Sequence, residues 1–209
     1  AIMFHGARTT LVIGIVATLV ASTVGIVVGA LAGFYGGWLD DILMRFTEVF
    51  QTIPNLIFLL AVVALLGAKI DNIVFAIGLV SWTSIARMVR AEFLSLRERE
   101  FVLACRTIGM SSFGLIFRQI LPNALPPVIV MASLLVAGAV LFEAALSFLG
   151  LSDPEVASWG RLIGEGRSGL RTAWFISAIP GVAILFTVLG LNLIGDGLND
   201  ALNPKLKDK

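Results

Sequence analysis

The segment Leu11–Gly33, LVIGIVATLVASTVGIVVGALAG, contains no charged residue. An α-helix needs roughly 17–25 apolar residues to cross about 30 Å of hydrocarbon, so this run is long enough to span a membrane. Gly25, Gly29 and Gly33 recur within it at every fourth position. Glycine lets a neighbouring helix approach closely and gain dispersion contacts that lipid does not supply. The segment predicts a membrane helix with a packing face, and a moving gate on that face is the alternative.

The whole chain shares this apolar character. Of its 209 residues 58% are hydrophobic and 14% are charged, and the mean hydropathy is +0.97. A soluble domain carries about 25% charged residues, so lipid must cover much of this surface. The only cysteine, Cys105, excludes an internal disulfide, and the only histidine, His5, excludes an imidazole cluster. We expect no metal, no cofactor and no catalytic residue in this chain.

Four further apolar runs are candidates for membrane helices. They lie at about 49–67, 72–86, 128–149 and 172–194. Pro54 lies near the start of the first of these runs and Pro180 lies inside the last. None of the runs alternates polar and apolar residues with a period of two, which excludes a membrane β-barrel. The predicted fold is all-α and polytopic, with five membrane helices.

Lysine and arginine set the expected orientation, because cytoplasmic loops are enriched in both. Placing the connection between the third and fourth runs inside puts ten of the 15 basic residues on the inner side. They are Arg45, Arg87, Arg90, Arg97, Arg99, Arg106, Arg118, Lys205, Lys207 and Lys209. Five spans with an internal C-terminus place Ala1 outside, although no export signal is visible. We therefore expect a sixth, upstream membrane helix in the intact protein.

A polar insert, EREFVLACRTIGMSSFGLIFRQILPN (98–123), separates the third and fourth runs. Two short apolar patterns in it have helical spacing: Phe101, Ala104, Cys105 and Ile108, then Phe113, Ile116, Phe117 and Ile120. Gly109 is expected to end the first helix in a left-handed conformation, and Ser111 or Ser112 to cap the second. Leu121-Pro122 is expected to end the second helix, since proline disfavours helix at the preceding residue. The insert predicts an amphipathic elbow that either lies in the lipid interface or is gripped by another protein.

The elbow resembles the loop by which binding-protein-dependent ABC importers dock their ATPases. That loop has the pattern Glu-Ala-Ala, three residues, Gly, nine residues, Ile, one residue, Leu-Pro. The corresponding residues here are Leu103-Ala104-Cys105, Gly109, Gln119 and Leu121-Pro122. Leu103, Cys105 and Gln119 replace the Glu, the second Ala and the Ile of the pattern. Glu100, one turn earlier, is a candidate replacement for the missing carboxylate.

Seven collinear segments extend the resemblance over nearly all of the chain. They are GARTTLVIG (6–14), GFYGGWLDDILMR (33–45), SWTSIARMVRAEFLSLREREFV (81–102), FRQILPNALPP (117–127), EAALSFLGL (143–151), SWGRLIGEG (158–166) and NLIGDGLNDALNP (192–204). Together they look like the C-type permease subunit of dipeptide, oligopeptide and nickel importers.

This resemblance implies the type I ABC importer transmembrane fold over 7–198 and a cytoplasmic tail at 199–209. It implies an ATPase-coupling loop at 91–122 and an external loop at 150–171, where a solute-binding protein lands. The implied protein is a multi-pass, six-helix component of the bacterial inner membrane with a cytoplasmic C-terminus. Its implied partners are a homologous second permease subunit, two cytoplasmic ATPase subunits, an external solute-binding protein and the lipid bilayer, without nucleic acid.

The resemblance also implies which residues couple the permease to its ATPases. They are Phe101, Ala104, Cys105, Arg106, Gly109, Phe113, Phe117, Arg118, Leu121 and Pro122. ATP and Mg would bind to the ATPase subunits, since no GxxxxGK[ST] P-loop occurs in this chain. The implied cargo is peptides, with nickel or glutathione as alternatives. A proton-driven carrier or channel is a more distant alternative, and an intramembrane enzyme lacks any catalytic constellation in the spans.

Two groups of charged residues need partners. Glu143 lies inside an apolar run, where an unpaired carboxylate costs about 3 kcal/mol. Its place near the outer end favours pairing with an external arginine or a backbone donor, and a pore contact or a proton-coupling role is the alternative. Asp40 and Asp41 are expected to pair locally with Arg45, at helical spacing.

Overall fold

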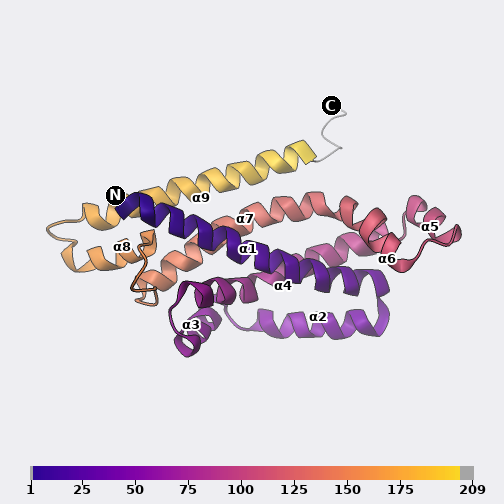
Figure 1. Cartoon of the computed structure of the whole chain (residues 1–209), viewed down its shortest axis with the longest axis horizontal. Coiled ribbons are helices and arrows are strands. Elements are labelled where there is room, and N and C mark those ends of the chain that lie inside the picture. Colours follow the sequence, from indigo (N-terminus) through magenta and orange to yellow (C-terminus); the bar gives the residue numbers. More distant parts are fainter. Residues whose placement is uncertain (1, 203–209) are drawn as a thin grey trace.

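The computed structural model describes residues 2–202, and the regular elements in that range are all helices (Figure 1). In chain order they are α1 (Ile2–Tyr35), α2 (Gly37–Thr52), α3 (Asn55–Leu66), α4 (Ile70–Leu96), α5 (Glu100–Thr107), α6 (Ser112–Gly114), the π-helix η1 (Leu115–Ile120), α7 (Leu121–Phe148), α8 (Trp159–Gly166), the 3₁₀-helix η2 (Arg167–Gly169) and α9 (Phe175–Leu202). Lys205, Lys207 and Lys209 lie outside the described residues.

The long helices lie side by side in an elongated bundle (Figure 1). α8 covers the end that holds the N-terminus, and α5 projects at the opposite end. Within residues 2–202 four helices are long and apolar enough to cross a membrane: α1, α4, the continuous helix Ser112–Phe148 and α9. A fifth span results only if α2 and α3 are taken together.

The predicted span at 49–67 is not one straight helix. α2 and α3 meet at an angle of 86°, with the break at Ile53 and Pro54. Ile53 has the extended conformation (φ −86°, ψ 127°) that a following proline favours. An aromatic cluster of Phe46, Phe50, Phe58 and Trp82 then connects α2, α3 and α4. The apolar run at 49–67 is therefore broken near its start, where Pro54 turns the chain.

The other runs continue as helix beyond their predicted limits. α1 extends the run at 11–33 at both ends, and α4 continues ten residues past Ala86 through two arginines. α9 starts near the predicted position but runs to Leu202, through Asp196 and Asp200. An apolar run marks only the part of a helix that contacts lipid or the protein core. The helix itself can continue into polar surroundings, so its ends lie beyond the run.

The glycine face of α1 packs against α4. A Cβ atom on Gly25 would lie 2.7 Å from the Cβ of Ile85, and one on Gly33 would lie 2.6 Å from the Cβ of Phe93. Gly29 lies between them against Val89, so four-residue spacing on one helix meets four-residue spacing on the other. Because real Cβ atoms do not approach so closely, a larger residue at these positions would force the two helices apart.

Candidate functional site

The elbow between α4 and α7 is built on a tight turn. α5 ends at Thr107, and Gly109 follows with φ 84°, the left-handed conformation expected from the sequence. Ser111 then caps the next helix, since its hydroxyl accepts a hydrogen bond of 3.3 Å from the N–H of Gly114. A side chain at position 109 would be strained in this conformation.

One side of the elbow is anchored in the bundle core. Val102 is fully buried, and Leu115, Ile116 and Ile120 join it in a cluster with Phe93 of α4. Of the apolar pattern predicted for α5, one residue packs against this core and the other three are exposed. Cys105 packs against the core, but Phe101, Ala104 and Ile108 are exposed. Val102 takes the buried position instead, and its spacing of three residues from Cys105 is the signal that could have identified it.

The other side of the elbow exposes large apolar side chains. Ile108, Phe113 and Phe117 are 80%, 71% and 50% exposed. The rings of Phe113 and Phe117 lie against each other, with centroids 4.4 Å apart. Arg106 and Arg118 are also exposed. The elbow thus combines a rigid base with an uncovered patch of aromatic, aliphatic and basic side chains.

Pro122 does not end the second helix of the elbow. Leu121 and Pro122 lie within one continuous helix that runs from Ser112 to Phe148. The π-helix Leu115–Ile120 precedes them, and the N–H of Leu121 bonds to the carbonyl of Ile116, five residues earlier. The wider turn gives room for the proline ring, which would clash in a regular α-helix. The expectation of a break was wrong, and the elbow is joined directly to a membrane-length helix.

Arg90 of α4 and Arg97, directly after α4, hold the start of the elbow to the beginning of α2 and the end of α1. Arg90 forms two hydrogen bonds with the carboxylate of Asp40, at 2.5 and 2.6 Å. Arg97 donates to the carbonyls of Gly33 and Phe34 at the end of α1. The predicted pairing of Asp40 with Arg45 is therefore wrong, since Arg45 approaches Glu48 instead. Helical spacing cannot reveal a partner 50 residues away.

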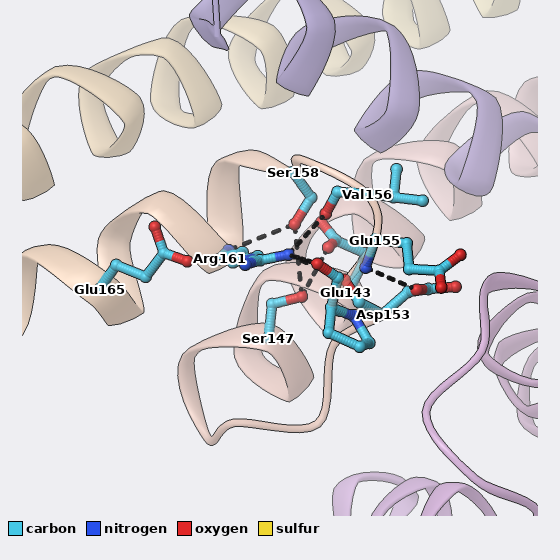
Figure 2. Close-up of polar contacts among 9 residues, drawn as sticks. Glu143, Ser147, Asp153, Glu155, Val156, Ser158, Arg161 and Glu165 are labelled. Atoms are coloured by element: carbon cyan, nitrogen blue, oxygen red, sulfur yellow. Dashed lines mark hydrogen bonds and ion pairs between the residues drawn. The ribbon is translucent and has the colours of Figure 1, made fainter.

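A buried carboxylate, that of Glu143, lies among polar side chains beside the start of α8 (Figure 2). Glu143 of α7 is 1% exposed, and its Oε1 accepts a hydrogen bond of 2.7 Å from Ser147. Its Oε2 accepts one of 3.3 Å from Thr10 of α1. Ser158, just before α8, lies 3.4 Å from the Ser147 hydroxyl. We refer to Thr10, Glu143, Ser147 and Ser158 as the Glu143 cluster.

The partners of Glu143 differ from those expected. They are hydroxyl groups rather than an arginine or a backbone donor. Arg161 lies nearby (Figure 2), but its guanidinium pairs with Glu165 and donates to carbonyls of the preceding loop, including that of Asp153. Ser147, four residues after Glu143, could have been found from helical spacing. Nothing in the sequence pattern indicates Thr10 or Ser158.

The loop that carries α8 is fixed at several further points. Trp159 donates its ring N–H to the carbonyl of Met3, and Asp153 accepts from the N–H of Ile70 at the start of α4. A Cβ atom on Gly160 would lie 2.6 Å from the Cα of Ala144, so α8 is in close contact with α7. Among residues 2–202 no group of three His, Cys, Asp or Glu side chains is placed to hold a metal.

These features define a class of protein: a polytopic integral membrane protein with an exposed basic elbow at one end. The chain matches the model of the binding-protein-dependent transport system inner membrane component family over residues 25–208. It belongs to this family, and it is an integral inner-membrane component of such a system.

Curated relatives and solved structures agree with this assignment. The chain is 40% identical over 204 residues to a dipeptide transport system permease protein of Alkalihalophilus pseudofirmus, covering 97% of this chain and 67% of the relative. It is 43% identical over 201 residues to an oligopeptide transport system permease protein of Escherichia coli, covering 96% and 67%. The fold is similar to that of an inward-facing methionine ABC transporter, with a TM-score of 0.76, 18% identity and coverage of 97% and 96%. The resemblance drawn from the seven segments and the all-α type I importer fold are confirmed.

Proposed function

We propose that this chain is one half of the translocation pore of an ATP-driven importer for peptides. The observation that carries the proposal is the exposed patch of Ile108, Phe113, Phe117, Arg106 and Arg118 on a rigid elbow. Aromatic and arginine side chains commonly dominate the energy of protein interfaces. A patch of this composition, held by a buried base, suits docking into a cleft of an ATPase.

The energy for transport comes from separate subunits. The chain has no P-loop with which to hold ATP phosphates, so ATP and Mg bind to two cytoplasmic ATPases. α4 runs into the elbow on one side, and the helix Ser112–Phe148 leaves it on the other. Closure of an ATPase dimer around the elbow would therefore move two membrane helices together and switch the side on which the pore opens.

The charge distribution supports an orientation with the elbow inside the cell. Six arginines lie near or on the elbow: Arg87, Arg90, Arg97, Arg99, Arg106 and Arg118. Cytoplasmic segments carry such an excess of basic residues. The C-terminus is then cytoplasmic, and the loop 150–171 with α8 faces outward, where a solute-binding protein delivers cargo. A homologous permease subunit supplies the other half of the pore.

Peptide cargo is inferred from the relatives, two of which are named as dipeptide and oligopeptide permeases. Nickel complexes and glutathione are the alternatives within the same architecture. A proton-driven carrier has less support, because the buried carboxylate of Glu143 is bound by the hydroxyls of Thr10 and Ser147. Glu143 is the only acidic residue in the five apolar runs of the sequence, so these runs offer no second acid that could pass on a proton.

The test is uptake of a labelled dipeptide into vesicles that hold the complete complex. We expect Gly109→Val and Phe117→Asp to abolish ATP-driven uptake, because the first strains the turn and the second places a charge in the docked patch. Gly197→Val is the matched control, since a Cβ there meets no atom within 4 Å. Normal uptake by both elbow variants would contradict ATPase docking. Competition by nickel chelates or glutathione, rather than by peptides, would replace the peptide assignment.

A further inference from the structure

The hydrogen bonds of the Glu143 cluster are arranged so that each donor leads toward the carboxylate of Glu143. A hydroxyl group has one proton to donate and can accept from other donors. The backbone N–H of Trp159 donates to the Thr10 hydroxyl at 3.3 Å, and the Thr10 proton is then directed to Oε2 of Glu143, also at 3.3 Å. A short chain of donors therefore leads from the first residue of α8 through α1 to Glu143.

A second chain of donors reaches the other carboxylate oxygen (Figure 2). The N–H of Arg161 donates to the Ser158 hydroxyl at 3.2 Å. Ser158 and Ser147 hydroxyls are 3.4 Å apart, and Ser147 donates its proton to Oε1 of Glu143. Since Ser147 has only one proton, Ser158 is the donor between the two serines.

Both chains begin in the first turn of α8. The first N–H groups of a helix have no acceptor within the helix and carry its partial positive charge. Thr10 on one side, and Ser158 with Ser147 on the other, connect these N–H groups to the carboxylate of Glu143 through hydrogen bonds. This carboxylate forms no ion pair within residues 2–202. The negative charge of Glu143 is thus matched to the start of α8, and α8 is held to both α1 and α7.

α7 connects this cluster to the elbow. The continuous helix Ser112–Phe148 carries Glu143 and Ser147 near one end and Phe113 and Phe117 at the other. Gly160 brings α8 into close contact with Ala144 on the same helix. A displacement of α8 therefore acts on the end of a single helix whose other end is the elbow.

We infer that Glu143 is a positioning residue that attaches α8 to α7, so that contact of the solute-binding protein with α8 is transmitted to the ATPase-docking elbow. This inference rests on the proposed function, which puts the binding protein at α8 and the ATPases at the elbow. Glu143 itself contacts neither cargo nor ATPase. Its charge holds α8 in a fixed position relative to the helix that leads to the elbow.

The experiment compares the complete complex carrying Glu143→Gln, Thr10→Val or, as the matched control, the exposed Glu48→Gln. ATP hydrolysis is measured without and with solute-binding protein saturated with a defined mixture of di- to pentapeptides. Hydrogen exchange of the Trp159 and Arg161 amides is measured in the same samples and resolved to single amides. We expect Glu143→Gln to lower the stimulation ratio about tenfold and to raise exchange at both amides about tenfold, because a hydrogen-bonded charge is lost.

Thr10→Val removes one donor chain while keeping the side-chain shape. We expect it to raise exchange at Trp159 and not at Arg161, with a smaller loss of stimulation, and this variant decides the question if Glu143→Gln does not assemble. Unchanged stimulation, or unchanged exchange at these amides, would overturn the inference. A parent complex that the binding protein does not stimulate would instead contradict the proposed function, and the exchange data would still test the attachment of α8.

Discussion

At the scale of single residues, the three glycines of α1 determine how closely two membrane helices meet. Gly29 is the most restrictive of the three, because a Cβ there would meet the backbone carbonyl oxygen of Ala86 more closely than a Cβ on Gly25 or Gly33 would meet any atom. Backbone atoms cannot move aside as a side chain can. We therefore expect Gly29→Val to destabilise the protein by about 1–3 kcal/mol, the usual cost of overpacking.

The measurement is thermal unfolding of the purified protein in detergent. Gly190→Val serves as the control, because it places the same side chain in the middle of α9, where a Cβ meets nothing within 4 Å. We expect a clear decrease in Tm for position 29 only. Equal Tm values for the two variants would show that α1 and α4 do not pack as closely as the structure indicates.

Residues that act through their own backbone or helix face could be predicted from sequence. The spacing of Gly25, Gly29 and Gly33 indicates a packing face without any knowledge of its partner, and Gly109 indicates a left-handed turn. The same holds for Ser147, four residues after Glu143, but the partner of Glu143 on α1 could not be predicted in this way. Thr10 lies 133 residues away in the chain, so only the fold brings its hydroxyl to the carboxylate.

At the scale of helices, Asp40 and Arg90 hold α2 against α4. The Asp40 side chain is 10% exposed and that of Arg90 is 34% exposed, so solvent screens the pair only in part. We expect Asp40→Asn or Arg90→Gln to reduce the free energy of unfolding by about 1–3 kcal/mol, below the cost of breaking a fully buried pair. Unfolding by titration with SDS is the measurement.

A double-mutant cycle separates the interaction from the individual side chains. We expect a coupling energy of about 1–2 kcal/mol between positions 40 and 90, and partial recovery when the two charges are exchanged. Arg45→Gln is the matched control, because the pair of Arg45 and Glu48 is 85% and 64% exposed. Exposed pairs contribute roughly 0–1 kcal/mol. A coupling energy near zero would show that the pair of Asp40 and Arg90 does not hold α2 against α4.

Hydropathy predicted where the membrane helices lie, but not whether the chain bends at a proline. The sequence shows Pro54 and Pro122 alike inside or beside apolar runs, yet the chain bends by 86° at the first and continues as helix through the second. The difference lies in the preceding residues. Leu115–Ile120 widen into a π-helix ahead of Pro122, whereas Ile53 is extended ahead of Pro54. A local propensity rule treats both prolines as the same signal.

At the scale of the whole molecule, the basic residues predict which end faces the cytoplasm. In a protein with Cys105→Ser, we expect Ile108→Cys on the elbow to be protected from an impermeant maleimide in intact cells. It should react once the membrane is permeabilised and peripheral proteins are removed. Ser168→Cys in the 3₁₀-helix η2, where Ser168 is exposed, should react in intact cells. The opposite labelling pattern would invert the orientation and with it the proposed function.

The corner between α2 and α3 determines what surrounds this part of the protein. α3 begins with Asn55, Leu56 and Ile57 and has no side-chain cap. The first backbone hydrogen bond of this helix is donated by the N–H of Phe58 to the carbonyl of Pro54. The peptide N–H groups of these three residues are therefore left without helical acceptors, and hydrocarbon offers none. Acyl chains cannot solvate this corner. It must be wetted, or covered by the polar backbone of another chain, wherever it lies relative to the bilayer.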